Sequence, residues 1–172
     1  WQHEEDLAGH DLTHLRLDSP AFAYGARIPT RFTEDGPDIS AALRWDPPPA
    51  GTRELALIMD DPDAPTPEPW VHWLLYRIPA GITELPEAIP AAERLDRALR
   101  LGDAMQGRNS WGTVGYRGPA PPRGHGEDRY HFKLYALSGP VHAPGGADKL
   151  TLERAMSGLV LARADLTGTY ER

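Results

Sequence analysis

The densest group of acidic side chains lies in the turn Asp60-Asp-Pro-Asp-Ala-Pro65. Asp60, Asp61 and Asp63 place three carboxylates within four positions, and the prolines stiffen the turn and remove backbone donors. We expect at least one carboxylate to face a partner rather than water. The alternative is an ordinary turn at a strand end with solvated acids, and the residues alone leave both interpretations open.

His72, in Trp70-Val-His-Trp73, is the second residue that could do chemistry. In a strand over 71–78 it would share a face with Trp70, Leu74, Tyr76 and Ile78. A functional imidazole needs a group that orients it, usually a carboxylate on one ring nitrogen. The preceding aspartate turn could supply that carboxylate from Asp61. The alternative is a histidine satisfied inside the core.

A glycine- and proline-rich segment, Gly115-Tyr-Arg-Gly-Pro-Ala-Pro-Pro-Arg-Gly124, precedes Arg129-Tyr-His-Phe132. Glycines let backbone N–H groups approach a ligand closely, and consecutive N–H groups form anion-binding nests. The alternative is a proline-rich connector. The whole stretch 102–126 is long for a loop in a compact domain, which favours an ordered, functional loop.

The composition narrows the classes of binding partner that the protein can have. The chain has 172 residues, enough for one domain, with 25 acidic against 18 basic residues and a net charge of −7. Because the sequence also lacks a stripe of basic residues, the negative net charge argues against nucleic acid and anionic membrane surfaces as binding partners. The absence of cysteine excludes disulfides and thiolate chemistry. No apolar run reaches the length of about 18 residues needed for membrane insertion.

The elements that must position these residues are mostly strands. Apolar or alternating patterns predict strands over 53–60, 71–78 and 129–137, with shorter ones at 15–17, 42–45 and 165–170. In 129–137, we expect Tyr130, Phe132, Leu134 and Ala136 to share one face. Thr151 is the expected cap of a helix whose apolar stripe runs to Val160, and 91–99 is a shorter expected helix. Residues 1–14 are expected to form a loosely ordered tail, and 15–172 a single domain.

Four motifs occur in a specific order. They are Asp61-Pro-Asp-Ala-Pro65, Trp70-x-His72, Gly118-Pro-x-Pro-Pro122-x-Gly and Arg129-Tyr130-x-Phe132. In this order the sequence resembles the phosphatidylethanolamine-binding protein family, most closely its bacterial and archaeal, Raf-kinase-inhibitor-like (YbhB/YbcL-type) branch. Further similar segments, such as Asn109-Ser-Trp-Gly112 and Gly168-Thr-Tyr-Glu171, extend the resemblance from residue 15 to the end.

The resemblance implies a mainly β fold, a Greek-key β-sandwich of two antiparallel sheets with a few short peripheral helices. It implies a small pocket for phosphate, phosphoryl head groups or acetate-like anions, with no metal and no cofactor, in a monomer or homodimer. The positions that match the family's pocket are Asp61, Asp63, Pro65, His72, Gly118, Pro121, Pro122 and Tyr130.

The sequence departs from the family pattern at two positions. The family usually has histidine immediately before the Arg-Tyr pair, where this chain has Asp128, and a carboxylate there would repel an anion. His125 is the expected substitute, and Trp70, His125 and Asp128 are expected as accessory pocket residues. Glu34 replaces the cysteine that is common in the bacterial branch.

Three function classes follow from these residues. The first is a small-anion-binding protein with a regulatory role, in which His72, the Tyr130 hydroxyl and backbone N–H groups hold the anion. The alternative is a small-molecule hydrolase that uses Asp61 and His72 as an acid/base pair. It lacks a Gly-x-Ser-x-Gly or His-Glu-x-x-His motif, and Ser110 has no motif around it.

The third class is a protein regulator that inhibits a kinase or a protease through the pocket rim, with Arg117 and Arg123 in the contact surface. The expected compartment is the cytoplasm. The first residue, Trp1, leaves a removed signal peptide open, and with it a periplasmic or secreted protein.

Overall fold

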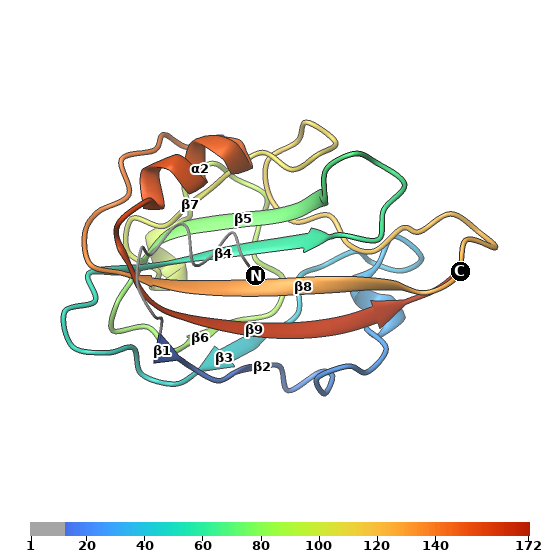
Figure 1. The fold of residues 1–172 in the computed structure, drawn as a ribbon, viewed down its shortest axis with the longest axis horizontal. Helices are drawn as coiled ribbons and strands as arrows, with labels where there is room; N and C mark the ends of the chain where they lie inside the picture. Colours follow the sequence, from blue (N-terminus) through green and yellow to red (C-terminus); the bar gives the residue numbers. More distant parts are fainter. Residues whose placement is uncertain (1–12) are drawn as a thin grey trace.

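The computed structural model describes residues 13–172, which form two β-sheets (Figure 1). The larger sheet has the strand order β1-β9-β8-β4-β5-β7, and the smaller has the order β2-β3-β6. The strands are β1 (Thr13–His14), β2 (Leu17–Asp18), β3 (Leu43–Trp45), β4 (Glu54–Asp61), β5 (Trp70–Pro79), β6 (Glu84–Leu85), β7 (Met105–Gln106), β8 (Asp128–Leu137) and β9 (Val160–Tyr170). The predicted two-sheet, mainly β architecture is confirmed, except that β1 pairs with β9 in parallel.

The main core lies between the two sheets. It takes Leu43 and Trp45 from the small sheet and the inward residues of β4, β5, β8 and β9 from the large one. The alternation predicted for β8 is confirmed, because Tyr130, Phe132, Leu134 and Ala136 all belong to this core. Burial of such side chains is the main force that holds the sheets together.

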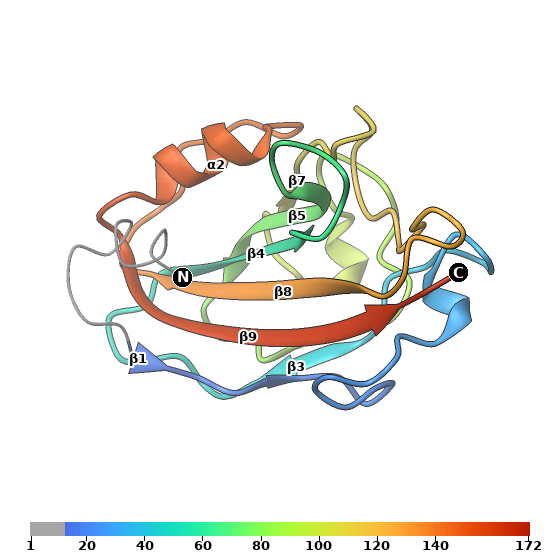
Figure 2. The ribbon, with the colours of Figure 1, turned by 45° about the vertical axis from the view of Figure 1, so that its right-hand side comes forward.

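A second apolar cluster covers the opposite face of the large sheet. Helix α2 (Lys149–Met156) packs there through Leu152 and Met156. Figure 2 shows α2 and the small sheet on opposite sides of β8 and β9. Within residues 13–172, no helix has the length and apolarity needed to cross a membrane.

The predicted boundaries of α2 were wrong at both ends. The cap is Asp148, whose Oδ1 accepts a hydrogen bond from the Thr151 N–H at 2.9 Å, so the helix begins before Thr151. At the other end, Gly158 adopts φ +80° and turns the chain. Val160, which fits the helical stripe, therefore begins β9.

The predicted helix over 91–99 was also wrong. Only a short 3-10 helix, Arg97–Leu99, forms there. The buried Gln106 amide donates to the carbonyls of Pro90 and Ala92 at 2.7 and 2.9 Å, and these contacts hold the segment in a non-helical path. A further 3-10 helix spans Thr30–Phe32.

The N-terminal prediction is tested only in part. Residues 1–12 of the predicted tail lie outside the described residues. Thr13 and His14, also assigned to the tail, form β1 against Ala162 and Arg163 of β9.

Strand β5 differs from a regular strand. The β4–β5 pairing shifts register between Met59 and Asp60. As a result His72 contacts Tyr130 of the core between the sheets, whereas Leu74 and Tyr76 face the cluster under α2. The predicted common face of these three residues was therefore wrong.

Candidate functional site

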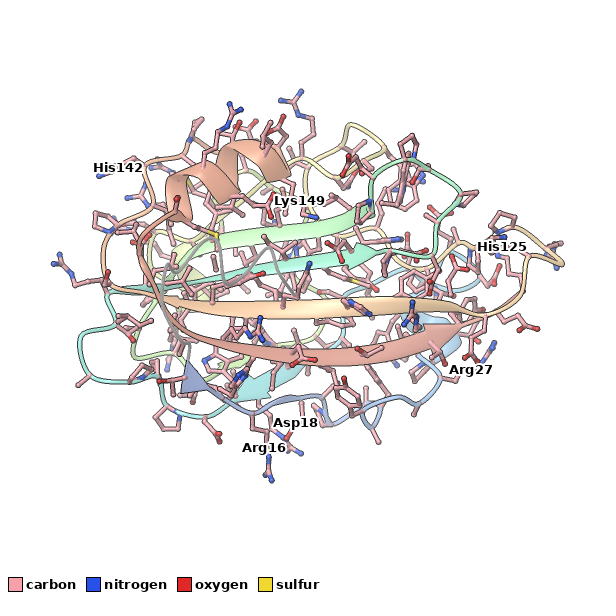
Figure 3. The ribbon with its side chains drawn as sticks, viewed as in Figure 1. Arg16, Asp18, Arg27, His125, His142 and Lys149 are labelled. Carbon is pink, nitrogen blue, oxygen red and sulfur yellow. The ribbon has the colours of Figure 1, made fainter. Side chains whose placement is uncertain are left out.

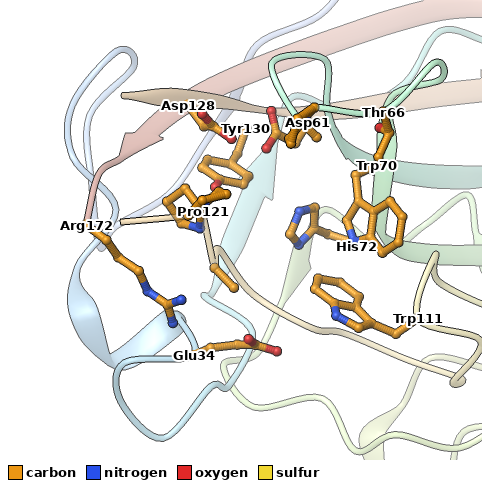
Figure 4. Close-up of a pocket in the computed structure, with 14 residues that line it drawn as sticks. Glu34, Asp61, Thr66, Trp70, His72, Trp111, Pro121, Asp128, Tyr130 and Arg172 are labelled. Atoms are coloured by element: carbon orange, nitrogen blue, oxygen red, sulfur yellow. The ribbon is translucent and has the colours of Figure 1, made fainter. Parts of the chain in front are cut away.

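A pocket of about 310 Å³ opens at one end of the large sheet (Figure 4). The antiparallel pairing brings together the end of β4, the starts of β5 and β8, and the end of β9, with Asp61 opposite Trp70 and Asp128 opposite Tyr170. The proline-rich loop completes the wall. The lining residues are Glu34, Asp61, Ala64, Pro65, Thr66, Trp70, His72, Trp111, Ala120, Pro121, Pro122, Asp128, Tyr130 and Arg172.

Most of the residues singled out in the sequence meet in this pocket. Of the eight family positions, six line it, together with two of the three accessory residues. They are Asp61, Pro65, His72, Pro121, Pro122 and Tyr130, with Trp70 and Asp128. Asp61, Trp70, His72, Asp128 and Tyr130 lie at or near strand ends on the same side of the sheet, so strand pairing gathers them. The three prolines come from the loops beside these strand ends.

Asp63 lies outside the lining and fixes the loop instead. Its carboxylate accepts hydrogen bonds from the Arg129 backbone N–H at 2.8 Å and from the Arg129 guanidinium at 2.9 Å. This paired charge holds the pKa of Asp63 below its usual value, chiefly through the side-chain hydrogen bond. Asp63 thus ties the loop after β4 to the start of β8.

Gly118 also lies outside the lining. A Cβ on this residue would come within 2.1 Å of the Phe32 carbonyl oxygen, and its N–H donates to Asp38 Oδ1 at 2.8 Å. The glycine is therefore required for close packing of two loops, a different role from the ligand approach that the resemblance implied.

His72 is buried, with 2% of its surface exposed, and its orienting partner differs from the expected one. Nδ1 lies 2.6 Å from the carbonyl oxygen of Arg117, so the predicted orientation by Asp61 was wrong. Burial lowers the pKa of His72 to about 4. At neutral pH the imidazole is uncharged, its Nδ1–H donates to Arg117, and Nε2 remains a hydrogen-bond acceptor.

Asp61 and Asp128 form a buried carboxyl pair, with 3% and 1% exposure. Burial, followed by the hydrogen bond to Asp128, raises the pKa of Asp61 to about 8. Asp61 therefore keeps a proton at neutral pH, which it donates to Asp128, and its Oδ1 accepts from the Asp63 N–H at 2.8 Å. The pair carries one proton and one negative charge.

The arginines around the pocket already have carboxylate partners. Arg172, on the pocket wall, pairs with Asp35 at 3.0 Å. Arg117 pairs with Glu34 at 2.6 Å and lies over the Trp111 ring at 4.4 Å. The pocket has cationic groups at its edge without a surplus of positive charge.

Six pocket residues were not predicted as site residues: Glu34, Ala64, Thr66, Trp111, Ala120 and Arg172. Trp111 could have been found from the Asn-Ser-Trp-Gly motif that contains it. Glu34 was noted in the sequence only as a departure from the family pattern. Arg172 has no local signal, because only the β8–β9 pairing carries the chain end to the pocket.

The pocket combines a proton donor, Asp61, with a neutral acceptor, His72. Among the described residues that line it, the only hydroxyl groups belong to Thr66 and Tyr130. Ser110 lies elsewhere, where its Oγ accepts from the Val71 N–H at 2.8 Å. Within residues 13–172, no three His, Asp or Glu side chains are grouped to hold a metal ion.

The fold and the site define a two-sheet β-sandwich with one polar and aromatic pocket at the strand ends. A family model described as "Phosphatidylethanolamine-binding protein" matches residues 18–171. The chain belongs to the phosphatidylethanolamine-binding protein family, which confirms the resemblance found in the motifs.

Relatives and solved structures agree with this assignment. The UPF0098 protein of Methanothermobacter thermautotrophicus is 45% identical over 158 residues, which cover 92% of this chain and 99% of the relative. UPF0098 protein PH1269 of Pyrococcus horikoshii is 40% identical, with 95% and 80% covered. The crystal structure of Escherichia coli YbcL, described as a member of the mammalian PEBP family, has a TM-score of 0.83, 29% identity and coverage of 92% and 98%. The putative PEBP homologue CT736 of Chlamydia trachomatis has a TM-score of 0.81, 34% identity and coverage of 93% and 99%.

Proposed function

We propose that this protein binds a small ligand through a phosphate, phosphoryl or carboxylate group and acts by binding rather than turnover. The observation that carries the proposal is the convergence of the Arg172 guanidinium and the Tyr130 hydroxyl on one pocket. The Tyr130 hydroxyl makes no hydrogen bond to another of the described residues. Both groups are donors suited to anionic oxygens.

The protonated Asp61 carboxyl supports the same proposal. An ionised Asp61 would repel an anion, whereas the neutral acid repels it far less. His72 contributes differently from the sequence-based expectation, because its neutral ring offers an acceptor rather than a positive charge. The pocket volume of about 310 Å³ suits a head-group-sized ligand.

We infer that occupancy of the pocket regulates a protein partner, of the kinase or protease class that the resemblance implies. The loop over 118–124 forms part of the pocket wall through Pro121 and Pro122, so a bound ligand would contact it directly. Arg123 is exposed on this loop, while Arg117 is held by Glu34. Arg123 is therefore the better contact of the two for a partner.

The test is heteronuclear NMR of the labelled protein titrated with inorganic phosphate and with acetate. We expect saturable shifts at Asp61, Tyr130 and the 118–124 loop. Arg172→Gln should weaken phosphate binding about ten-fold or more, because it removes a charge-assisted hydrogen bond.

The matched control is Arg27→Gln. Arg27 lies over Tyr170 at 4.3 Å, near the same end of β9 but outside the pocket lining (Figure 3). It should leave phosphate binding unchanged. Absence of saturable shifts with both anions, or equal weakening by the two arginine variants, would refute the proposed anion site.

A further inference from the structure

A second cavity, of about 510 Å³, lies between the start of β5 and the start of α2. Its walls come from the end of the loop after β4, from β5, from the loop over 108–110 and from the N-terminal half of α2. We call the space bounded by Glu68, Val71, Ser110 and Leu150 the α2 groove. No residue lines both the groove and the ligand pocket, so the groove is a separate site.

The α2 groove exposes an apolar side chain that the fold itself does not use. Leu150 is 56% exposed and, with Tyr24, is one of the two large hydrophobic side chains that are exposed in the described part of the chain. Leu152 and Met156 of the same helix pack on the sheet, so α2 is held in place without Leu150. Val71 lies in the wall formed by β5. A large apolar side chain in the groove would contact both Leu150 and Val71.

The charges of the α2 groove indicate what should accompany that apolar side chain. The charged lining residues are Glu68, Asp148 and Glu153 against Arg108 and Lys149. Lys149, at the start of α2 (Figure 3), already binds the buried Asp60 at 2.8 Å. Glu68 is exposed, and its carboxylate forms no hydrogen bond or ion pair with another described residue. The groove is therefore acidic and complementary to a lysine or arginine side chain.

A shared wall separates the α2 groove from the ligand pocket. Strand β5 presents Trp70 and His72 to the pocket and Val71 to the groove. The loop after β7 divides in the same way, with Trp111 in the pocket and Ser110 in the groove. The Val71 N–H donates to Ser110 Oγ at 2.8 Å, and the Ser110 N–H donates to the Val71 carbonyl at 2.9 Å. The groove and the pocket are thus two sides of one hydrogen-bonded pair of segments.

We propose that the α2 groove is a docking site for a peptide segment of a partner protein, in which a large apolar side chain is flanked by lysine or arginine. The apolar side chain packs on Leu150 and Val71, and the cation pairs with Glu68. Docking changes the affinity of the ligand pocket, because the partner contacts the segments that carry His72 and Trp111. This communication rests on the proposed function, whereas docking does not.

The test uses two peptides of equal length as probes. Acetyl-Gly-Lys-Leu-Leu-Lys-Gly-amide carries the apolar pair between cations, and acetyl-Gly-Glu-Leu-Leu-Glu-Gly-amide carries it between anions. In NMR titrations of the labelled protein, we expect saturable shifts at Val71, Ser110 and Leu150 with the lysine peptide. It should bind about five-fold or more tightly than the glutamate peptide. Absence of localised shifts, or equal affinity for the two peptides, would overturn the docking site.

Two variants, each with a matched control, locate the binding. Leu150→Ala should weaken the lysine peptide about five-fold, because part of an apolar contact is lost, whereas Tyr24→Ala changes the other exposed side chain and should have no effect. Glu68→Gln should weaken it about three-fold. Glu84→Gln removes the same charge from β6 and should have no effect. Equal effects within either pair would reduce the binding to non-specific attraction and refute the site.

The phosphate titration, repeated with saturating lysine peptide, tests the communication through the wall. We expect the phosphate affinity to change about five-fold, and the peptide affinity to change by the same factor at saturating phosphate, because coupling is reciprocal. An unchanged phosphate affinity would refute the communication. Binding of the peptide by a protein that does not bind phosphate would refute the anion site and leave docking standing.

A second copy of this chain is the competing occupant of the α2 groove. The mass in solution, measured by light scattering after size-exclusion chromatography, distinguishes the two. A dimer that Leu150→Ala dissociates would show that self-association covers the groove, and it would overturn docking of a partner. A mass that Leu150→Ala leaves unchanged supports a groove that is open to the partner.

Discussion

The carboxyl pair predicts an unusual dependence of stability on pH, which Asp61→Asn should remove. Asparagine keeps the hydrogen bonds of the protonated acid, because its oxygen can accept from the Asp63 N–H and its amide can donate to Asp128. It cannot ionise. The substitution therefore isolates the titration of Asp61 from its packing.

The sign follows from the two pKa values. Asp61 titrates at about 8 in the folded protein and at 3.8 as an ordinary carboxyl, so the folded state binds more protons and stability falls as pH rises through this window. His72 acts in the opposite sense between about 4 and 6.5, because its folded state is neutral and its unfolded state is protonated. Above pH 6.5 only the Asp61 effect remains of the two.

Without solvent screening, the titration of Asp61 from pH 6.5 through its pKa should lower the free energy of unfolding by about 2 kcal/mol. The pocket opens to water, which screens the pair, so we expect about 1 kcal/mol. Urea unfolding at pH 6.5 and at about pH 9 measures this difference.

The original protein should lose about 1 kcal/mol more than Asp61→Asn over this range. Asp165→Asn, a carboxylate removed from outside the pocket, should keep the original slope. The shared proton would be contradicted if the free energy of unfolding of Asp61→Asn fell with pH as steeply as that of the original protein. It would also be contradicted if the stability of the original protein rose with pH.

Two further predictions concern other contacts. Gly118→Ala should destabilise the fold by about 2 kcal/mol or more in urea unfolding, because its Cβ would meet the Phe32 carbonyl at 2.1 Å, and a loss below about 0.5 kcal/mol would refute the packing role. Asp60→Ala should cost about 3 kcal/mol, since it leaves Lys149 and Lys133, at 2.8 and 3.0 Å, beside an empty buried site, and a near-neutral thermal shift would contradict this.

The sequence predicted the long strands well because their patterns are local. The continuous apolar run of β4 and the alternation of β8 require burial in any fold that keeps them as strands. The helix boundaries were harder to predict from the sequence. Thr151 is a good cap by type, yet Asp148 caps α2, and only the turn at Gly158 separates the helix from β9.

Within the site, the residues at strand ends were predictable and their partners were not. Asp61, His72 and Tyr130 belong to the motifs that carried the family resemblance, and antiparallel pairing brings them together. The carbonyl that orients His72 comes from Arg117, far along the chain, and no residue type marks a backbone carbonyl as a partner. Arg172 reaches the pocket only through the pairing of β9 with β8.

The identity of the side chain at position 128 therefore decides more than one contact. A cationic residue there would favour an ionised Asp61, whereas Asp128 holds a proton on Asp61 and leaves one charge on the pair. The lining residues alone suggest two surplus negative charges, and the shared proton leaves one. The shared proton therefore lowers the repulsion that a phosphoryl or carboxylate group near Arg172 and Tyr130 would meet.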